Sequence, residues 1–205
     1  MLVNIFKDVL PDVWPMLIII TVILSSLRIA YLAKGHKKLQ IHKEIMALIF
    51  IIYILCLFHV VTFQDINYGT SNFTPFKEIF RYSVGSDKFF KNILGNILLF
   101  VPYGFFASYY LKNKKFGLIA FLTLIVSFTI EAVQYYIGRV FDIDDIILNL
   151  IGGIIGFLIY VSIEAIRAKL PKILKNDTIL DLLIIIVIVL IIVYAFDLNI
   201  FGLCL

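Results

Sequence analysis

Cysteine, histidine and charged residues are all scarce in this chain of 205 residues. The positions of its two cysteines, Cys56 and Cys204, do not suggest a disulfide framework. No P-loop, HExxH, CxxC or GxSxG pattern occurs, and two of the three histidines, His36 and His42, lie in one basic connection. Covalent hydrolase chemistry of the Ser–His–Asp kind therefore has no support in the sequence.

Apolar side chains, in contrast, are abundant. They make up 62% of the residues, and the mean hydropathy of +1.04 is far above that of a soluble domain. Six runs are long enough, at about 20 residues each, to cross a bilayer as helices. We expect these helices at Val13–Ala33, Ile45–Phe63, Asn92–Leu111, Phe116–Ile137, Ile143–Ile163 and Ile179–Phe196. The predicted fold class is an all-α, polytopic membrane helix bundle with about six transmembrane helices.

The positions of Lys and Arg predict the orientation of the bundle. Twelve of the eighteen basic residues lie in the first, third and fifth connections between the expected helices. Because basic residues resist translocation, we expect these connections in the cytoplasm and both termini outside. The net charge of +4 then reflects topology, and no nucleic-acid partner is expected. The basic stretch Lys34–Lys43 is interpreted as a stop-transfer flank, with contact to anionic lipid headgroups as the alternative.

Polar residues gather where the fourth and fifth expected helices meet. On the fourth helix, one face carries Thr123, Ser127, Glu131 and Gln134, at steps of four, four and three. The corresponding stripe on the fifth helix holds Asp142, Asp145, Asn149, Gly152 and Gly156. Asn96 lies at the same level on the third helix. Gly152 and Gly156 have the G-x-x-x-G spacing that lets two helix backbones approach closely, so we expect them to pack against a neighbour.

Arg139 lies in the turn between Glu131 and the aspartates. A carboxylate inside a membrane is costly, so it faces a partner or a wet cavity. Arg139 could clamp two helices through Glu131 or Asp142, or its planar fork could hold the phosphate or carboxylate of a ligand. The acids could also bind Mg²⁺ or Ca²⁺. Asp144 and Asp145 point to different sides of one helix, however, and neither a metal nor another cofactor is predicted.

Three motifs in this order resemble the VanZ-like membrane proteins. The first two are "NFTPFKEI" at Asn72–Ile79 and "GNILLFVPYGFF" at Gly95–Phe106. The third is the spacing E-x2-Q-x4-R-x2-D-x2-D-x3-N-x2-G-x3-G, which runs from Glu131 to Gly156. We therefore expect a VanZ-like core with three transmembrane helices at 72–160. An extension with two helices precedes it at 1–71, and a basic loop with the last helix follows at 161–205.

The resemblance implies a role in the envelope of bacteria, because the family's namesake is linked to teicoplanin resistance. We expect a multi-pass protein of the bacterial cytoplasmic membrane with an outward-facing polar pocket. Its partner would be a membrane lipid, a lipid-linked cell-wall intermediate or a lipoglycopeptide. The alternatives are an enzyme or transporter acting on a polyprenyl-phosphate or related lipid, and an assembly partner without a ligand. Whether the protein is an enzyme stays open.

The candidate site residues take different roles in these hypotheses. As a binding protein, it would hold an anionic ligand with Arg139, while Gln134, Asn96 and Asn149 donate further hydrogen bonds. In the empty site, Glu131 and Asp145 would orient Arg139, and Asp142 would complete the cluster. As an enzyme or transporter, it would use Glu131 and Asp145 as acid–base groups and Arg139 on the phosphate.

Overall fold

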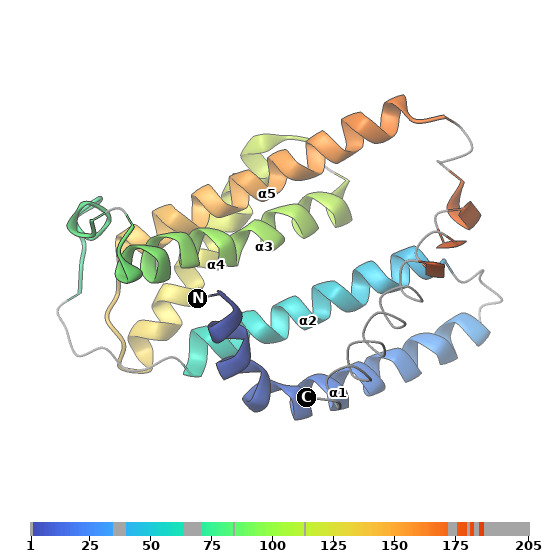
Figure 1. Ribbon diagram of the computed structural model, residues 1–205, viewed down its shortest axis with the longest axis horizontal. Helices are drawn as coiled ribbons and strands as arrows, with labels where there is room; N and C mark the ends of the chain where they lie inside the picture. The colour runs from blue at the N-terminus through green and yellow to red at the C-terminus, as the bar shows by residue number, and fades with distance from the viewer. Residues whose placement is uncertain are drawn as a thin grey trace, which may run out of the picture. The chain divides into compact units, whose positions relative to one another are not determined.

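The computed structural model describes the backbone of residues 2–34, 40–63, 71–83, 85–112, 114–171, 176–179, 181–182 and 185–186. Regular structure in these residues is helical throughout (Figure 1). The elements are α1 (Leu2–Lys34), α2 (Ile41–Phe63), the 3₁₀ turn η1 (Ile79–Arg81), the π-helical turn η2 (Phe89–Leu94), α3 (Gly95–Leu111), α4 (Phe116–Tyr136) and α5 (Ile143–Lys169). The predicted all-α membrane bundle is confirmed.

Five helical segments of the described chain are long and apolar enough to cross a membrane. They are Trp14–Lys34, Ile41–Thr62, Phe89–Leu111, Phe116–Tyr136 and Ile143–Lys169. The helix expected at Ile179–Phe196 lies largely outside the described residues. Helix α1 begins at Leu2, well before the expected Val13, because hydropathy marks the apolar part of a helix and not its first turn.

The chain divides into two compact units. One comprises Met1–Leu17 and Ile52–Ala165, and the other comprises Ile18–Ile51 and Ile166–Leu205. Within the second unit, the guanidinium of Arg28 donates two hydrogen bonds of 2.9 Å to the Glu44 carboxylate. There, too, the ring of His42 lies 2.7 Å from the Asp181 carboxylate. The polar residues singled out from the sequence all belong to the first unit.

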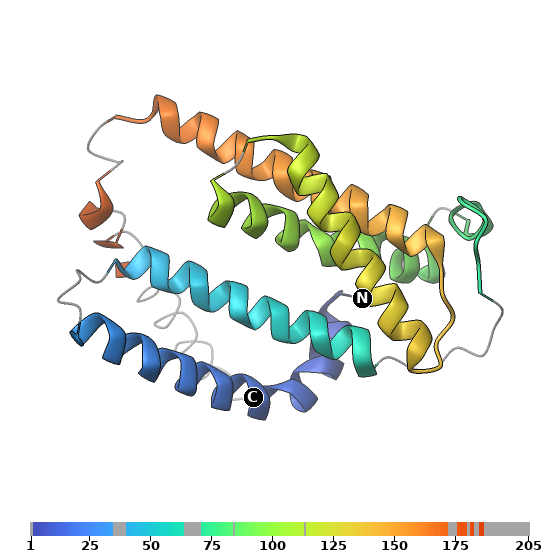
Figure 2. The same ribbon diagram turned by 180° about the vertical axis from the view of Figure 1, so that it is seen from behind.

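Glycines set the packing of α3, α4 and α5, which lie side by side in both views (Figures 1 and 2). A Cβ atom on Gly152 or Gly156 would collide with the backbone of α3, at the carbonyl groups of Ile97 and Val101 respectively. A Cβ on Gly153 would meet the side chain of Thr123 on α4. Lipid tails are as apolar as leucine, so such close contact is a main source of helix association in a membrane.

Candidate functional site: a buried polar network at one end of α4 and α5

The polar stripe of α4 faces the interior of the bundle. Its four members, Thr123, Ser127, Glu131 and Gln134, are all buried, and Glu131 is only 2% exposed. The Thr123 hydroxyl donates to the carbonyl of Ile119, four residues earlier, at 2.8 Å. A hydroxyl satisfied by its own helix can be buried at little cost, whereas Glu131 and Gln134 need partners from elsewhere.

The turn after α4 returns the chain toward those two residues. Gly138 adopts the left-handed region at φ 88°, its N–H donates to Tyr135 O at 3.1 Å, and the N–H of Arg139 donates to Gln134 O at 2.9 Å. This pair of bonds is the Schellman pattern that ends helices, and glycine suits its left-handed position best. The turn therefore brings the first residue after it, Arg139, back alongside the last turn of α4.

A chain of hydrogen bonds links Glu131 to Arg139 through the Gln134 amide. Assigned by its neighbours, that amide donates through Nε2 to Glu131 Oε1 at 3.1 Å and accepts through Oε1 from Arg139 Nη1 at 2.7 Å. The same Nη1 donates to the carbonyl of Val61 on α2 at 3.0 Å. The other Glu131 oxygen accepts the backbone N–H of Asp142 at 3.0 Å. Glu131, Gln134, Arg139 and Asp142 thus form one connected network.

Asp142 caps the start of α5 and joins it to a distant segment. Its Oδ1 accepts the backbone N–H of Asp144 at 2.9 Å, which is an N-cap bond, and the side-chain amide of Asn72 at 2.9 Å. Asn72 also pairs with the neighbouring backbone, at Phe141 O and Ile143 N. Burial raises the pKa of the Asp142 carboxyl above its usual range, although both hydrogen bonds oppose the rise.

Asp144 has a partner that the sequence did not reveal. Its carboxylate is 1% exposed and accepts three backbone N–H groups, from Phe76 at 2.5 Å, Glu78 at 2.7 Å and Ile79 at 3.2 Å. Asp144 and Asp145 do point to different sides of α5, yet Asp144 holds the segment that carries the "NFTPFKEI" motif. The motif itself was the one sequence feature that could have indicated this contact, because a turn around Pro75 leaves backbone N–H groups that need an acceptor.

The remaining predicted residues form two separate pairs. Asn96 on α3 donates its side-chain amide to Asp145 Oδ1, and Asn149 on α5 donates to the Ser127 hydroxyl at 2.9 Å. Asn149 Oδ1 is the buried side-chain acceptor of the described residues that has no hydrogen-bond partner. The seven predicted residues therefore lie at one end of α3, α4 and α5, in one network and two pairs.

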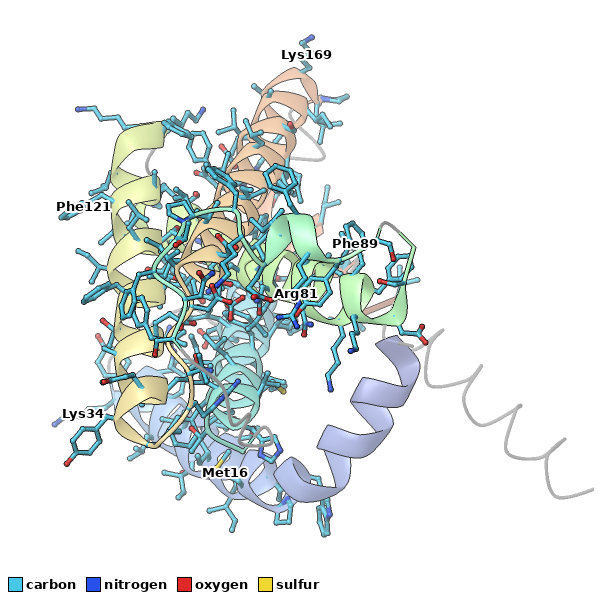
Figure 3. All side chains as sticks on the ribbon, turned by 90° about the vertical axis from the view of Figure 1, so that its left-hand side faces the viewer. Met16, Lys34, Arg81, Phe89, Phe121 and Lys169 are labelled. Carbon is cyan, nitrogen blue, oxygen red and sulfur yellow. The ribbon has the colours of Figure 1, made fainter. Side chains whose placement is uncertain are left out.

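Figure 3 looks onto this end of the bundle, with Arg81 and Phe89 labelled as landmarks. Across the described residues, no three His, Cys, Asp or Glu side chains converge as metal ligands would. Four carboxylates instead find different partners: backbone N–H groups, an amide, or both. The arrangement can position the guanidinium of Arg139, and the Oδ1 atom of Asn149 could accept one further hydrogen bond.

Comparison with known proteins shows a family match that includes this region. A family model described as VanZ/LLP1 matches residues 45–166, a range that contains the whole network. The chain is similar to Protein VanZ of Enterococcus faecium, with 28% identity over 123 residues, which make up 57% of this chain and 68% of that protein. No solved structure shows a significant match.

Proposed function

The chain belongs to the VanZ/LLP1 family, and from that premise we propose that this multi-pass membrane protein acts on the bacterial cell envelope by binding an anionic, lipid-linked or lipophilic ligand. The hydrogen-bond chain from Asp142 through Glu131 and Gln134 to Arg139 carries the proposal. It fixes a guanidinium at the junction of α2 and α4, and a held Arg fork is well suited to a phosphate or carboxylate.

A further amide group at this end of the bundle would contribute to the site. Asn149 Oδ1, buried and without a partner among the described residues, can accept a hydrogen bond from a ligand hydroxyl or amide. Such a group stays buried and unsatisfied only at a cost, about 1–3 kcal/mol, which a ligand would remove. The likeness to Protein VanZ makes resistance to teicoplanin-type glycopeptides the first phenotype to test.

Substitutions at Arg139 and Glu131 test the proposal. Arg139→Lys keeps the charge but loses the fork, so the variant should insert at normal levels, retain less co-purified anionic lipid by mass spectrometry, and lose the envelope phenotype. Glu131→Gln should insert at least as well and also lose function. Arg28→Lys, at an exposed site, is the matched control. Full rescue of abundance and phenotype by Arg139→Gln with Glu131→Gln would show that Arg139 is only a clamp.

A second candidate is an enzyme or transporter acting on a polyprenyl-phosphate or related lipid. It is favoured by the number of acids at this end, because Glu131 and Asp145 have different hydrogen-bond partners, the amides of Gln134 and Asn96. Carboxyl groups in different surroundings can take separate acid and base roles. In this case Glu131→Gln should abolish turnover or transport of a polyprenyl-phosphate in reconstituted vesicles while its binding stays measurable. A binding protein would show binding without turnover in every variant.

We also propose that the network lies in the outer leaflet of the cytoplasmic membrane, since the basic residues favour cytoplasmic odd-numbered connections. A cysteine at Lys114, in a chain freed of Cys56 and Cys204, should resist an impermeant thiol reagent in intact cells. A cysteine at Ser83 should react. The reverse pattern would move the network to the inner leaflet.

A further inference from the structure

The segment from Asn72 to Arg81 exposes aromatic side chains although it lies between helices. Phe73 is 68% exposed, Phe76 49% and Phe80 83%. Connecting segments usually expose polar side chains, and clustered exposed apolar ones mark an interaction surface. Phe76 moreover has a φ of 67°, a left-handed conformation that is unfavourable for a bulky residue. The backbone here would suit glycine, so the exposed ring at this position calls for an explanation.

The backbone donors of the same segment are almost completely satisfied. Asp144 takes the three N–H groups described above, and Pro75 has none to offer. The others donate to nearby oxygen atoms: Asn72 to Phe141 O, Thr74 to Asn72 Oδ1, Lys77 to Thr74 O, Phe80 to Phe76 O and Arg81 to Glu78 O. A loop in water does not require this. In an apolar surrounding it is essential, because each unpaired N–H costs several kcal/mol.

The aromatic surface continues onto the membrane-crossing part of α4. The ring of Phe73 stacks on Phe141 at a centroid distance of 5.3 Å, and Phe141 meets Phe128 of α4 edge-on at 6.4 Å. Phe128 is exposed on a candidate membrane-spanning helix, so its outer face meets lipid. The aromatic surface of the loop is therefore continuous with the lipid-facing surface of α4.

The charges of the loop fit the boundary between lipid tails and headgroups. The side chain of Arg81 is 69% exposed and bonds to Glu78 at 3.1 Å, and Lys77 of the same segment is also exposed. Exposed basic groups are attracted to the phosphates of a bilayer surface. Figure 3 shows Arg81 at the end of α3 that carries the loop.

We propose that Asn72–Arg81 is an interfacial anchor, whose three phenylalanines insert at the boundary of headgroups and acyl chains while Asp144 satisfies its backbone. The occupant of this aromatic surface is bilayer lipid, and the anchor does not depend on the ligand proposed for Arg139. The anchor would hold the segment that is bonded to Asp142 and Asp144 at a fixed depth in the membrane.

Tryptophan fluorescence tests the anchor. The chain has one tryptophan, so Trp14→Phe leaves a silent background for Phe80→Trp, with Phe73→Trp as a second reporter. The full chain is reconstituted in vesicles of phosphatidylcholine and phosphatidylglycerol. Lipids brominated near the headgroup should quench both reporters more than lipids brominated deep in the chain, and aqueous iodide should quench them weakly.

Two further variants calibrate depth. Ile125→Trp, exposed near the middle of α4, should be quenched most by deeply brominated lipid. Lys114→Trp, in a polar connection, should be quenched most by iodide supplied on both sides of the vesicle membrane. Loop reporters that behave like Lys114→Trp would overturn the proposal. So would reporters shielded from both bromine and iodide, because a second copy or another protein would then cover the surface.

Discussion

Helix α5 is held to its neighbours in two different ways along its length. At its start, Asp142, Asp144 and Asp145 accept hydrogen bonds from segments far away in the chain. Two turns further on, Gly152 and Gly156 press against the backbone of α3 without any side chain between. The segment from Gly152 to Gly156 contains no charged side chain and serves packing. In the acidic region, buried carboxylates bind a loop and take part in a hydrogen-bond network. Close helix packing alone would not require these carboxylates.

The difference shows what each kind of contact can do in a membrane. Close backbone packing gives many small dispersion gains and fixes the distance between helices. A buried carboxylate with several donors fixes the path of one particular segment, at the cost of removing a charge from water. If this division holds, damage to the glycines should affect the whole bundle, whereas damage to the acids should remain local.

The largest effect is expected from Gly156→Leu. Its side chain would have to displace the α3 backbone at Val101 and Phe105, and overpacking against backbone should cost about 3 kcal/mol or more. Thermal unfolding in detergent and the yield of folded protein measure the loss. Gly117→Leu is the matched control, since a Cβ there meets nothing within 4 Å, and its effect should be mild. Equal tolerance at both positions would remove glycine packing as a cause.

A smaller and local effect is expected from Asp144→Asn. An amide can no longer accept all three backbone N–H groups of the loop, so we expect a loss of about 2 kcal/mol. Hydrogen exchange should accelerate at Phe76, Glu78 and Ile79 while the middle of α5 stays protected. Asp87→Asn, at an exposed position, is the control. A loss as large and as global as that of Gly156→Leu would mean that the acids hold the bundle too.

The smallest effect concerns Asp142 and pH. Burial raises the pKa of its carboxyl above the ordinary value of 3.8, so the folded protein binds this proton more tightly than the unfolded chain. The resulting stabilisation is full below the unfolded pKa and is lost as pH rises through the folded pKa. Asp142→Asn keeps the capping oxygen and should remove this pH dependence, with less than about 1 kcal/mol change at low pH. Thermal unfolding of both proteins across acidic pH measures how the stability of each changes with pH. An equal change in the two proteins would contradict the prediction.

The sequence by itself determined the helical class, because runs of about 20 apolar residues have few other stable structures. The stripe from Thr123 to Gln134 was also predictable, since helical spacing alone puts these residues on one face, and the structure buries all of them. The three motifs were sufficient to indicate the family. Each of these inferences depends on side chains that are close in sequence or on a property summed over a segment.

Only the tertiary structure decided the partners. Asp144 receives its hydrogen bonds from residues 65 to 68 positions away, and Arg139 reaches the carbonyl of Val61, 78 positions away. Backbone N–H and carbonyl groups are the same at every residue, so no letter of the sequence marks the ones that a buried carboxylate or guanidinium will meet. For the same reason, neighbouring aspartates look equivalent in sequence. The fold makes one of them a cap, one a loop anchor and one the partner of Asn96.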